Sequence, residues 1–428
     1  MTPRETIGGE AVAPAPRLLA LPGALRERDF RRFWAGETVS LFGDQVTLIA
    51  LPLVGVLALD ASASEMGYLT AAVIAPALFF SLHAGAWIDR RGRRRQTMIV
   101  TALGRAVLLA AIPVIYWLDA LTLTQLYVVS FLYGTLTVLF FVSYSTLFVS
   151  LVPRERYLEA NSLLNGSRAF SFVAGPSIGG LLVQAFSAPG ALIADAASFL
   201  VSAFTLSSIK AEEPPTEKAE RGHVKAGMRY LWHSPVIRAS LLATATINFF
   251  NFVFWALFML YAIRELDIGP GLLGVVLGAA SMGGVLGSIL TGRISRRIGI
   301  GPAFVLGCIV FPAPLVLVPL AGGPKWVVLG CLFAAEFLSG FGVMILDITG
   351  ASIKAALVPN RLRARVSGAY MVVNYGIRPL GALAGGALGT WIGLRPTLWI
   401  GAVGAILGAL WLLPSPVPRL RELPEADE

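Results

Sequence analysis

Long apolar segments, separated by shorter polar ones, follow one another along almost the whole chain. Apolar runs of about 20 residues recur from Phe33 to Leu413, and a helix of that length crosses a hydrocarbon layer of about 30 Å. The pattern predicts an all-α membrane protein with twelve transmembrane helices. The twelve segments lie at about 32–58, 65–88, 96–117, 124–150, 162–186, 190–209, 238–263, 271–294, 302–321, 326–351, 366–391 and 396–413.

The amino-acid composition excludes an ordinary soluble protein. Of the 428 residues, 56% are hydrophobic and only 14% are charged, whereas soluble domains carry roughly 25% charged residues. Residues 1–30 contain no apolar block followed by a small-residue cleavage site, so we expect no signal peptide. Cys308 and Cys331 both fall in apolar segments, where a buried small side chain explains them better than a disulfide or a metal site.

One long polar stretch, KAEEPPTEKAERGHVKAG at residues 210–227, separates the sixth apolar segment from the seventh. Its composition predicts a flexible linker that leads into a short amphipathic helix, MRYLWHSP, on the membrane surface. We therefore expect five regions: a cytoplasmic N-terminal segment (1–31), a six-helix bundle (32–209), a cytoplasmic linker (210–237), a second six-helix bundle (238–413) and a cytoplasmic tail (414–428).

Basic residues predict the orientation of the chain in the membrane. When the loops are assigned alternately to the two sides, only Arg264, Lys325 and Arg395 fall on the side opposite the N-terminus. Nearly all other lysines and arginines fall on the N-terminal side, which the positive-inside rule assigns to the cytoplasm. The pattern predicts a multi-pass protein of the cell inner (plasma) membrane with both termini in the cytoplasm.

The two bundles share a weak internal repeat. GAWIDRRG (85–92) reappears as GRISRRIG (292–299), and LVPRERYLEANSLL (151–164) reappears as LVPNRLRARVSGAY (357–370), at offsets of 207 and 206 residues. The glycine pair Gly179–Gly180 recurs at the second offset. Matches at nearly one spacing indicate two six-helix halves duplicated in parallel orientation, with a cavity between them.

At this point the chain resembles the major facilitator superfamily over essentially its whole length. The family pattern G-x-x-x-D-R-x-G-R-R between the second and third helices is matched by Gly85, Asp89, Arg90, Gly92, Arg93 and Arg94. The stretch GPSIGG is similar to the helix-5 motif of proton-coupled drug exporters and contains Gly175, Pro176, Gly179 and Gly180. Three stretches resemble the macrolide-efflux and enterobactin-exporter branch: GETVSLFGDQ (36–45), LVPRERYLEANSL (151–163) and GALIADAASFLVSA (190–203).

The resemblance implies a secondary active transporter that exports a lipophilic or amphipathic small molecule, such as a drug, siderophore or metabolite, in exchange for protons. An importer or lipid flippase of the same fold, or a non-transporting membrane sensor or scaffold, remains an alternative. The chain has no G-x-x-x-x-G-K-[ST] loop, no G-x-S-x-G elbow and no paired histidines, so we expect neither an enzyme nor a cofactor nor a metal site. The expected partners are the small-molecule substrate, protons and membrane lipids but no nucleic acid, and the expected state is a monomer.

Three acidic residues inside apolar segments are the candidates for proton coupling. Asp44 lies near the middle of the first segment, Glu37 lies two turns earlier on the same face, and Glu336 lies in the tenth segment. A charge within the membrane costs at least about 2.5 kcal/mol, and desolvation favours the neutral, proton-carrying form of a carboxylate. A purely structural polar contact between helices is the alternative for each of them.

Intramembrane arginines and amides are the candidates for substrate contacts. Arg378 and Arg168 could bind an anionic substrate group or pair with a carboxylate, whereas structural pairing is the preferred interpretation for Arg105. In the seventh segment, Asn248, Asn251 and Trp255 offer hydrogen bonds and an aromatic surface. Two further acids, Asp195 and Asp347, are expected near helix ends, either solvated or capping.

The arginine-rich loop GAWIDRRGRRRQ is expected to orient the chain and to meet anionic lipid heads. Its acid, Asp89, is the candidate for a conformational latch. When the cytoplasmic side closes, it would meet either the positive N-terminal end of the eleventh helix or the basic run Arg361, Arg363 and Arg365. Local pairing of Asp89 with the arginines beside it is the alternative.

Overall fold

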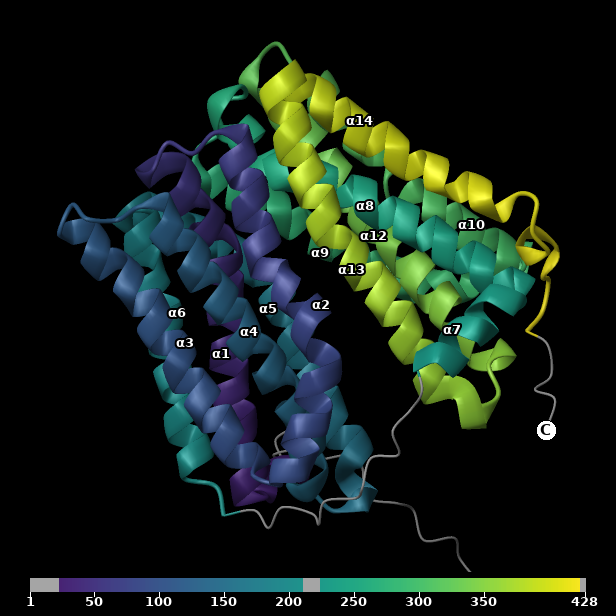
Figure 1. The fold of residues 1–428 in the computed structure, drawn as a ribbon, viewed down its shortest axis with the longest axis horizontal. Coiled ribbons are helices and arrows are strands. Elements are labelled where there is room, and N and C mark those ends of the chain that lie inside the picture. Colours follow the sequence, from purple (N-terminus) through teal and green to yellow (C-terminus); the bar gives the residue numbers. More distant parts are fainter. Residues whose placement is uncertain (1–22, 211–223, 424–428) are drawn as a thin grey trace, which may run out of the picture.

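The computed structural model describes residues 23–210 and 224–423, and within these two ranges all regular structure is helical. The helices form two bundles, coloured purple to teal and green to yellow in Figure 1, which lean against each other. A short helix, α7 (Val224–His233), precedes the second bundle and packs on its helices α8 and α13.

The first bundle contains six long helices, one for each of the first six predicted segments. They are α1 (Arg28–Leu53), prolonged by the π-helical turn Val54–Ala58, α2 (Ala63–Arg91), α3 (Arg94–Trp117), α4 (Leu123–Leu147), α5 (Tyr157–Phe186) and α6 (Ala188–Ser207). Capping boxes start α2 at Ser62 and α4 at Thr122, where side chains satisfy backbone N–H groups that the helix leaves unpaired.

The second bundle repeats this order. It contains α8 (Pro235–Arg264), α9 (Pro270–Ile298), α10 (Ile300–Val310), α11 (Leu317–Leu320), α12 (Lys325–Leu357), α13 (Asn360–Ile392) and α14 (Leu394–Leu407). One predicted span, the ninth, is broken: α10 and α11 are joined by a 3-10 segment that follows Pro312 and contains Pro314. Because proline lacks a backbone N–H, it interrupts a helix at this point.

In the described part of the chain, eleven helical segments are long and apolar enough to cross a membrane. The remaining predicted span is α13, which is 33 residues long but carries several arginines. It packs lengthwise against α2 of the first bundle and α8 of its own bundle, as a spanning helix of a two-bundle protein would. Its arginines, and not its length, distinguish α13 from the eleven apolar segments.

Two seams join the bundles, one between α2 and α13 and one between α5 and α9. In the first, a methyl group on Gly67 would lie 2.8 Å from Cα of Gly386. In the second, a methyl group on Gly180 would lie 2.9 Å from Cα of Gly274. The repeat offsets of 207 and 206 residues map one pair onto the other. Each seam therefore depends on small residues that let two backbones touch.

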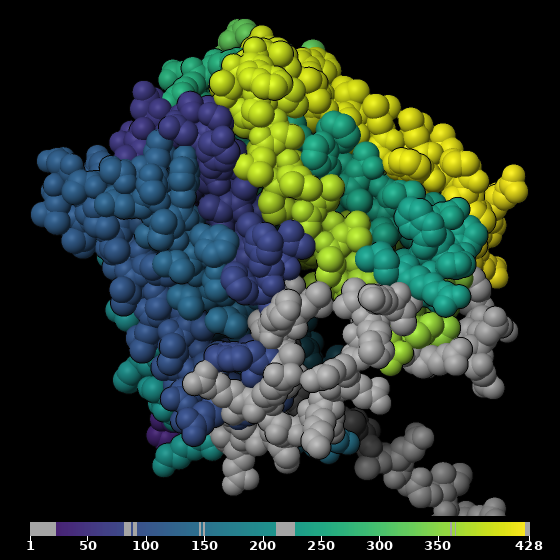
Figure 2. Space-filling model, in the orientation of Figure 1, coloured from purple at the N-terminus to yellow at the C-terminus, as the bar shows by residue number. Residues whose placement is uncertain are grey.

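The seams occupy one end of the molecule, which we call the closed end. There the ion pair between Asp60 and Arg264 links the two bundles. From this pair the seams continue to the contact of Leu78 with Gly376, near the middle of the helices. Figure 2 shows the same contact as a continuous surface between α2 and α13 in the upper half of the molecule.

At the opposite end the two bundles diverge (Figure 1). We call it the open end; α1 begins there at Arg28, α3 at Arg94 and α13 at Asn360. It is also the end that carries the arginine-rich loop and the first turns of α5. The structure is therefore that of a two-bundle protein open toward its basic side.

Candidate functional site

The acidic residues of α1 lie against charged and polar groups of three neighbouring helices. An Oδ1 atom of Asp44 lies 3.8 Å from Nη1 of Arg105 on α3 and accepts a hydrogen bond of 3.2 Å from the hydroxyl of Tyr133 on α4. Asp44 keeps 36% of its side-chain surface exposed, whereas the Arg105 side chain keeps 2%. The carboxylate thus stands between a buried cation and open space.

Arg105 is held by aromatic rings as well as by the carboxylate. Its guanidinium carbon lies 4.2 Å from the ring centre of Phe140 and 4.0 Å from that of Phe199. Such stacking compensates a desolvated cation through the negative faces of the rings. Among the described atoms, its Nε and Nη2 have no hydrogen-bond partner. The cation therefore depends strongly on Asp44 for its charge balance.

A third acid joins this cluster, and the expectation for it was wrong. Asp195, predicted to be solvated or capping near a helix end, lies two turns inside α6 and is 0% exposed. Its carboxyl contacts the hydroxyl of Thr47 on α1 and, at 2.8 Å, the hydroxyl of Ser198 on its own helix. A methyl group on Gly43 would collide with this carboxyl, so Gly43 makes the room for it.

The second acid predicted on α1, Glu37, is buried but has no direct ion pair among the described contacts. It lies within electrostatic range of Asp44, Arg105 and Arg168. Arg168, on α5, is half-buried. The structure thus places Glu37, Asp44 and Arg168 in one region of the first bundle, near the Asp195 cluster.

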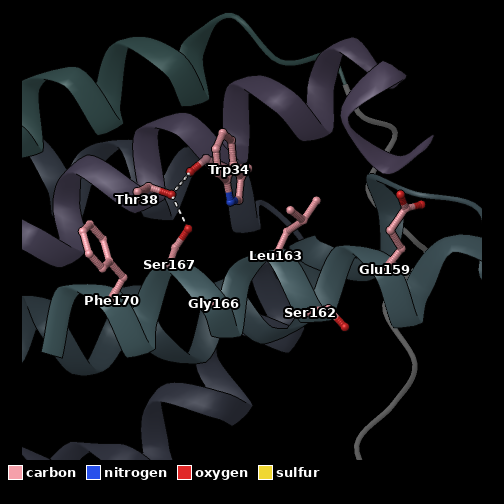
Figure 3. Close-up of a pocket in the computed structure, with 8 residues that line it drawn as sticks. All are labelled: Trp34, Thr38, Glu159, Ser162, Leu163, Gly166, Ser167 and Phe170. Atoms are coloured by element: carbon pink, nitrogen blue, oxygen red, sulfur yellow. Dashed lines mark hydrogen bonds between the residues drawn. The ribbon is translucent and has the colours of Figure 1, made fainter. Parts of the chain in front are cut away.

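A pocket of about 670 Å³ lies beside Glu37, between α1 and α5. Figure 3 shows its residues on the facing sides of the two helices. They are Trp34, Thr38, Glu159, Ser162, Leu163, Gly166, Ser167 and Phe170. The hydroxyls of Thr38 and Ser167 lie 2.9 Å apart at its inner wall, and the buried indole Nε1 of Trp34 has no partner among the described atoms.

The pocket faces the space between the bundles. Higher on α5, Val173 and Ser177 touch α9, where a methyl group on Gly278 would lie 3.2 Å from each of them. Phe170 and Gly166 continue this face of α5 toward the open end, because residues three, four and seven apart share one side of a helix. The pocket therefore lies where the second bundle has separated from this face.

In the second bundle, Arg378 is surrounded by amides and aromatic rings. Its Nε donates a hydrogen bond of 2.9 Å to Oδ1 of Asn248, whose Nδ2 donates one of 3.0 Å to Asn374. The guanidinium lies 4.1 Å from the ring centre of Tyr375. Its acidic neighbour in the described part is Asp347, which is exposed, rather than Asp44 or Glu336.

Of the remaining candidates of the second bundle, two are buried and one is partly buried. Glu336 is 1% exposed, and its Oε1 has no partner among the described atoms. Asn251 is also buried, with an unpartnered Nδ2 within the same described part. Trp255 is partly buried; its ring meets that of Phe258 edge to face, with ring centres 5.1 Å apart, and packs against the hydrophobic core. These three side chains do not join Arg378 in one cluster.

The loop between α2 and α3 is described only in part. The side chains of Gly85, Asp89 and Arg90 lie outside the described residues, so the latch remains a prediction. Gly92 ends α2 with φ 62°, a left-handed conformation that glycine adopts without strain. Beside it, Arg94 is buried and Arg93 is exposed.

The helix-5 motif packs α5 onto both of its neighbours. A methyl group on Gly175 would meet the side chain of Gln45, and one on Gly179 would lie 3.1 Å from Cα of Val46, both on α1. Gly180 and the carbonyl of Pro176 face Gly274 on α9. The motif is thus the point at which α5 joins its own bundle to the other one.

Comparisons with known proteins agree with this architecture. Residues 33–378 match the sequence profile of the Major Facilitator Superfamily. The chain is 28% identical to the multidrug efflux pump Tap of Mycolicibacterium fortuitum, over 90% of this chain and 95% of that protein. It is 24% identical to the multi-drug resistance efflux pump PmrA homolog of Lactococcus lactis subsp. lactis, over 78% and 82% of the two chains.

Solved structures show the same fold. A bacterial homologue of the iron transporter ferroportin in its inward-facing state has a TM-score of 0.75 at 15% identity, covering 90% of this chain and 98% of that one. A bacterial homologue of the lysosomal transporter Spinster, inward-facing and occupied, has a TM-score of 0.69 at 13% identity, covering 91% and 96%.

Two duplicated helical bundles that are joined at one end and diverge at the other (Figure 1) have the architecture of a membrane transporter. The chain belongs to the Major Facilitator Superfamily. The predicted fold class is confirmed, and the protein is a transporter and not an enzyme.

Proposed function

We propose that this transporter exports a lipophilic or amphipathic small molecule in exchange for protons, by alternating access. The observation that carries the proposal is Asp44, a partly exposed carboxylate in contact with the buried Arg105. A proton that binds Asp44 from the open space weakens this ion pair. Protonation is thereby linked to the packing of α1 against α3 and α4.

The open end is the basic end, and the positive-inside rule assigns it to the cytoplasm. In this orientation the conformation described here is inward-facing. It would receive substrate from the cytoplasm and release a proton there. The two inward-facing homologues of the same fold are consistent with this orientation.

The pocket between α1 and α5 suits a substrate with a large apolar surface. Its volume of about 670 Å³ falls within the range of about 300–1,000 Å³ that is common for ligand pockets. Trp34, Leu163 and Phe170 supply apolar contacts, and the unpartnered indole N–H supplies one donor. The names of the efflux-pump relatives support the same substrate class.

The second bundle offers a complementary group on its own side. Arg378, with Asn248 and Asn374, presents a cation and amides that suit a carbonyl or anionic group of the substrate. Export of an amphipathic molecule would then use apolar contacts from the first bundle and polar contacts from the second.

The test is a proteoliposome assay in which a pH gradient drives accumulation of a lipophilic dye. Asp44→Asn removes the exchangeable proton but keeps the shape, so we expect gradient-driven accumulation to be lost while dye binding remains. The matched control is Asp119→Asn, an exposed loop acid with φ 53°, a conformation that asparagine also tolerates.

If dye accumulation by the wild-type protein does not depend on the pH gradient, the proton-coupling part of the proposal is wrong. Accumulation only in vesicles of the opposite orientation would identify an importer, transfer of labelled lipid instead of the dye would identify a flippase, and no flux of either would favour a sensor or scaffold.

A further inference from the structure

Among the described contacts, the carboxyl of Asp195 is bonded by hydroxyl groups alone. Oγ of Ser198 lies 2.8 Å from the backbone carbonyl oxygen of Asp195 and also 2.8 Å from its Oδ1. A serine hydroxyl carries one hydrogen. That hydrogen can point to Oδ1 or to the carbonyl oxygen, so these contacts accommodate the carboxyl of Asp195 both with and without a proton.

The charges of the cluster favour one bound proton. Asp195 and Asp44 share one cation, Arg105, and each of the three is within electrostatic range of the others. Two ionised carboxylates against one guanidinium would leave a net negative charge among apolar helices, which is costly. One proton on the pair makes the cluster neutral.

The surroundings decide which carboxyl holds that proton. Asp44 contacts the cation directly and is partly exposed, so its ionised form is the better stabilised one. Asp195 is fully buried and touches only the hydroxyls of Thr47 and Ser198 among the described groups.

Few other charged or polar groups influence which of the two carboxyls holds the proton. α1 contributes Asp44, α3 contributes Arg105, and α4 contributes Tyr133 through its electrostatic interaction with Asp195. In the described part of the chain, α5 and the π-helical turn after α1 also pack on α6 but contribute no charged group to the interactions of Asp195.

We infer that Asp195 is a second proton-binding carboxyl of the coupling site, which holds the proton in this conformation while Asp44 is ionised against Arg105. The inference rests on the proposed proton exchange. The transfer is balanced: the proton leaves a carboxyl oxygen of Asp195 for a carboxylate oxygen of Asp44, and Asp195 becomes the anion that Arg105 then compensates. Asp44 exchanges protons with the open space, and Asp195 stores one behind it.

Infrared spectroscopy of the purified transporter in liposomes tests the stored proton directly, since a protonated carboxyl has its own carbonyl band that shifts in deuterated buffer. We expect Asp195→Asn to lose one component of this band, and Asp44→Asn and Glu336→Gln to keep that component. The amide of Asn can replace the protonated carboxyl in the bonds to Ser198, so the variant is expected to fold. Ser198→Ala keeps the carboxyl and is expected to shift the same component.

A transport arm separates this inference from the proposed function. Asp195→Asn is expected to retain dye counterflow, which needs no net proton movement, and to lose pH-gradient-driven accumulation; Asp195→Glu is expected to restore part of it. An unchanged carboxyl band together with a wild-type pH profile in Asp195→Asn overturns the inference alone. Wild-type transport that is indifferent to pH, with the band component still lost in Asp195→Asn, overturns the proposed coupling and leaves the buried proton established.

Discussion

The same helix crossing is built twice in this molecule, with acids in one half and aromatic rings in the other. Where α1 crosses α6, Gly43 leaves room for Asp195 and Ser198. Where α8 crosses α14, the glycine is on the other helix: a methyl group on Gly404 would collide with the ring of Phe250. The same helix crossing thus holds a polar cluster in the first half and an apolar contact in the second half.

The repeat offset also relates individual polar residues of the two halves to each other. A shift of 207 residues places Asn251 where the first half has Asp44. Both side chains are polar and lie on the first long helix of their bundle, but an amide exchanges no proton at neutral pH. We therefore propose that the first half carries the proton, while the amides and Arg378 of the second half contact the substrate. Two acids on α12, the buried Glu336 and the exposed Asp347, are the described features of the second half that argue against this division.

The largest expected effect follows from removing the buried cation of the first half. Arg105→Met leaves Asp44 without its partner; breaking a buried pair costs about 3–5 kcal/mol, and we expect the lower end of this range because the Asp44 side chain is 36% exposed. The half-buried Arg378, which is bonded to an amide, is the matched position of the second half, and Arg378→Met should cost less. Equilibrium unfolding in mixed detergent measures both free energies.

The double variant Arg105→Met with Asp44→Asn removes both charges and should recover much of this loss. If Arg105→Met and Arg378→Met lower the free energy of unfolding equally, or if the double variant recovers none of it, then the stability of the two halves does not depend differently on these charges.

The sequence was sufficient for most of the fold, because every spanning helix except the charged α13 is a long apolar run of its own. It was insufficient at the ninth span, where Pro312 and Pro314 break the helix within an apolar run that reads as continuous. The pattern also predicted that Glu37 and Asp44 share one face of α1, since that depends only on helical spacing.

The cluster around these acids could not be predicted from the sequence, because its contacts join helices that are far apart along the chain. Asp195 was expected at a solvated helix end; α6 instead begins at Ala188, and α1 covers the carboxyl completely. The signals that were available were an acid within a run of apolar and small residues and a serine three positions later. Likewise, the sequence left open whether Arg378 binds a substrate group or pairs with a carboxylate, and it did not indicate the bond to Asn248, which is 130 residues away.

A smaller effect is expected where the halves are alike. Gly180→Val and Gly386→Val add side chains where backbones touch at the two seams. Overpacking of this kind costs about 1–3 kcal/mol, which changes the ratio of two conformations roughly 5–150-fold. Because the seams are related by the repeat, both variants should open the closed end to a similar extent. Gly330→Val is the control, since a methyl group there meets nothing within 4 Å.

Fluorescence transfer between dyes attached at Asp119 and Gly322, in closed-end loops of the two halves, reports the opening. A wild-type distance in both valine variants would show that the seams do not hold the halves together. Opening in only one variant would show that the two seams, although alike in geometry, contribute unequally to the stability of the closed end.

The smallest effect is expected at the ion pair of the closed end, and its sign is the informative quantity. Asp60 pairs with Arg264 across the halves, but the Asp60 side chain is 94% exposed, so the pair contributes at most about 1 kcal/mol. Asp60→Asn should therefore shift the conformations away from the inward-facing one by no more than about fivefold. Asp89→Asn, which removes the latch predicted for the opposite end, should shift them toward it. Labelling of single cysteines placed near Arg168 measures both, because these sites are accessible only when the basic end is open. Shifts of the same sign in the two variants would contradict the assignment of Asp60 and Asp89 to opposite ends of one two-state movement.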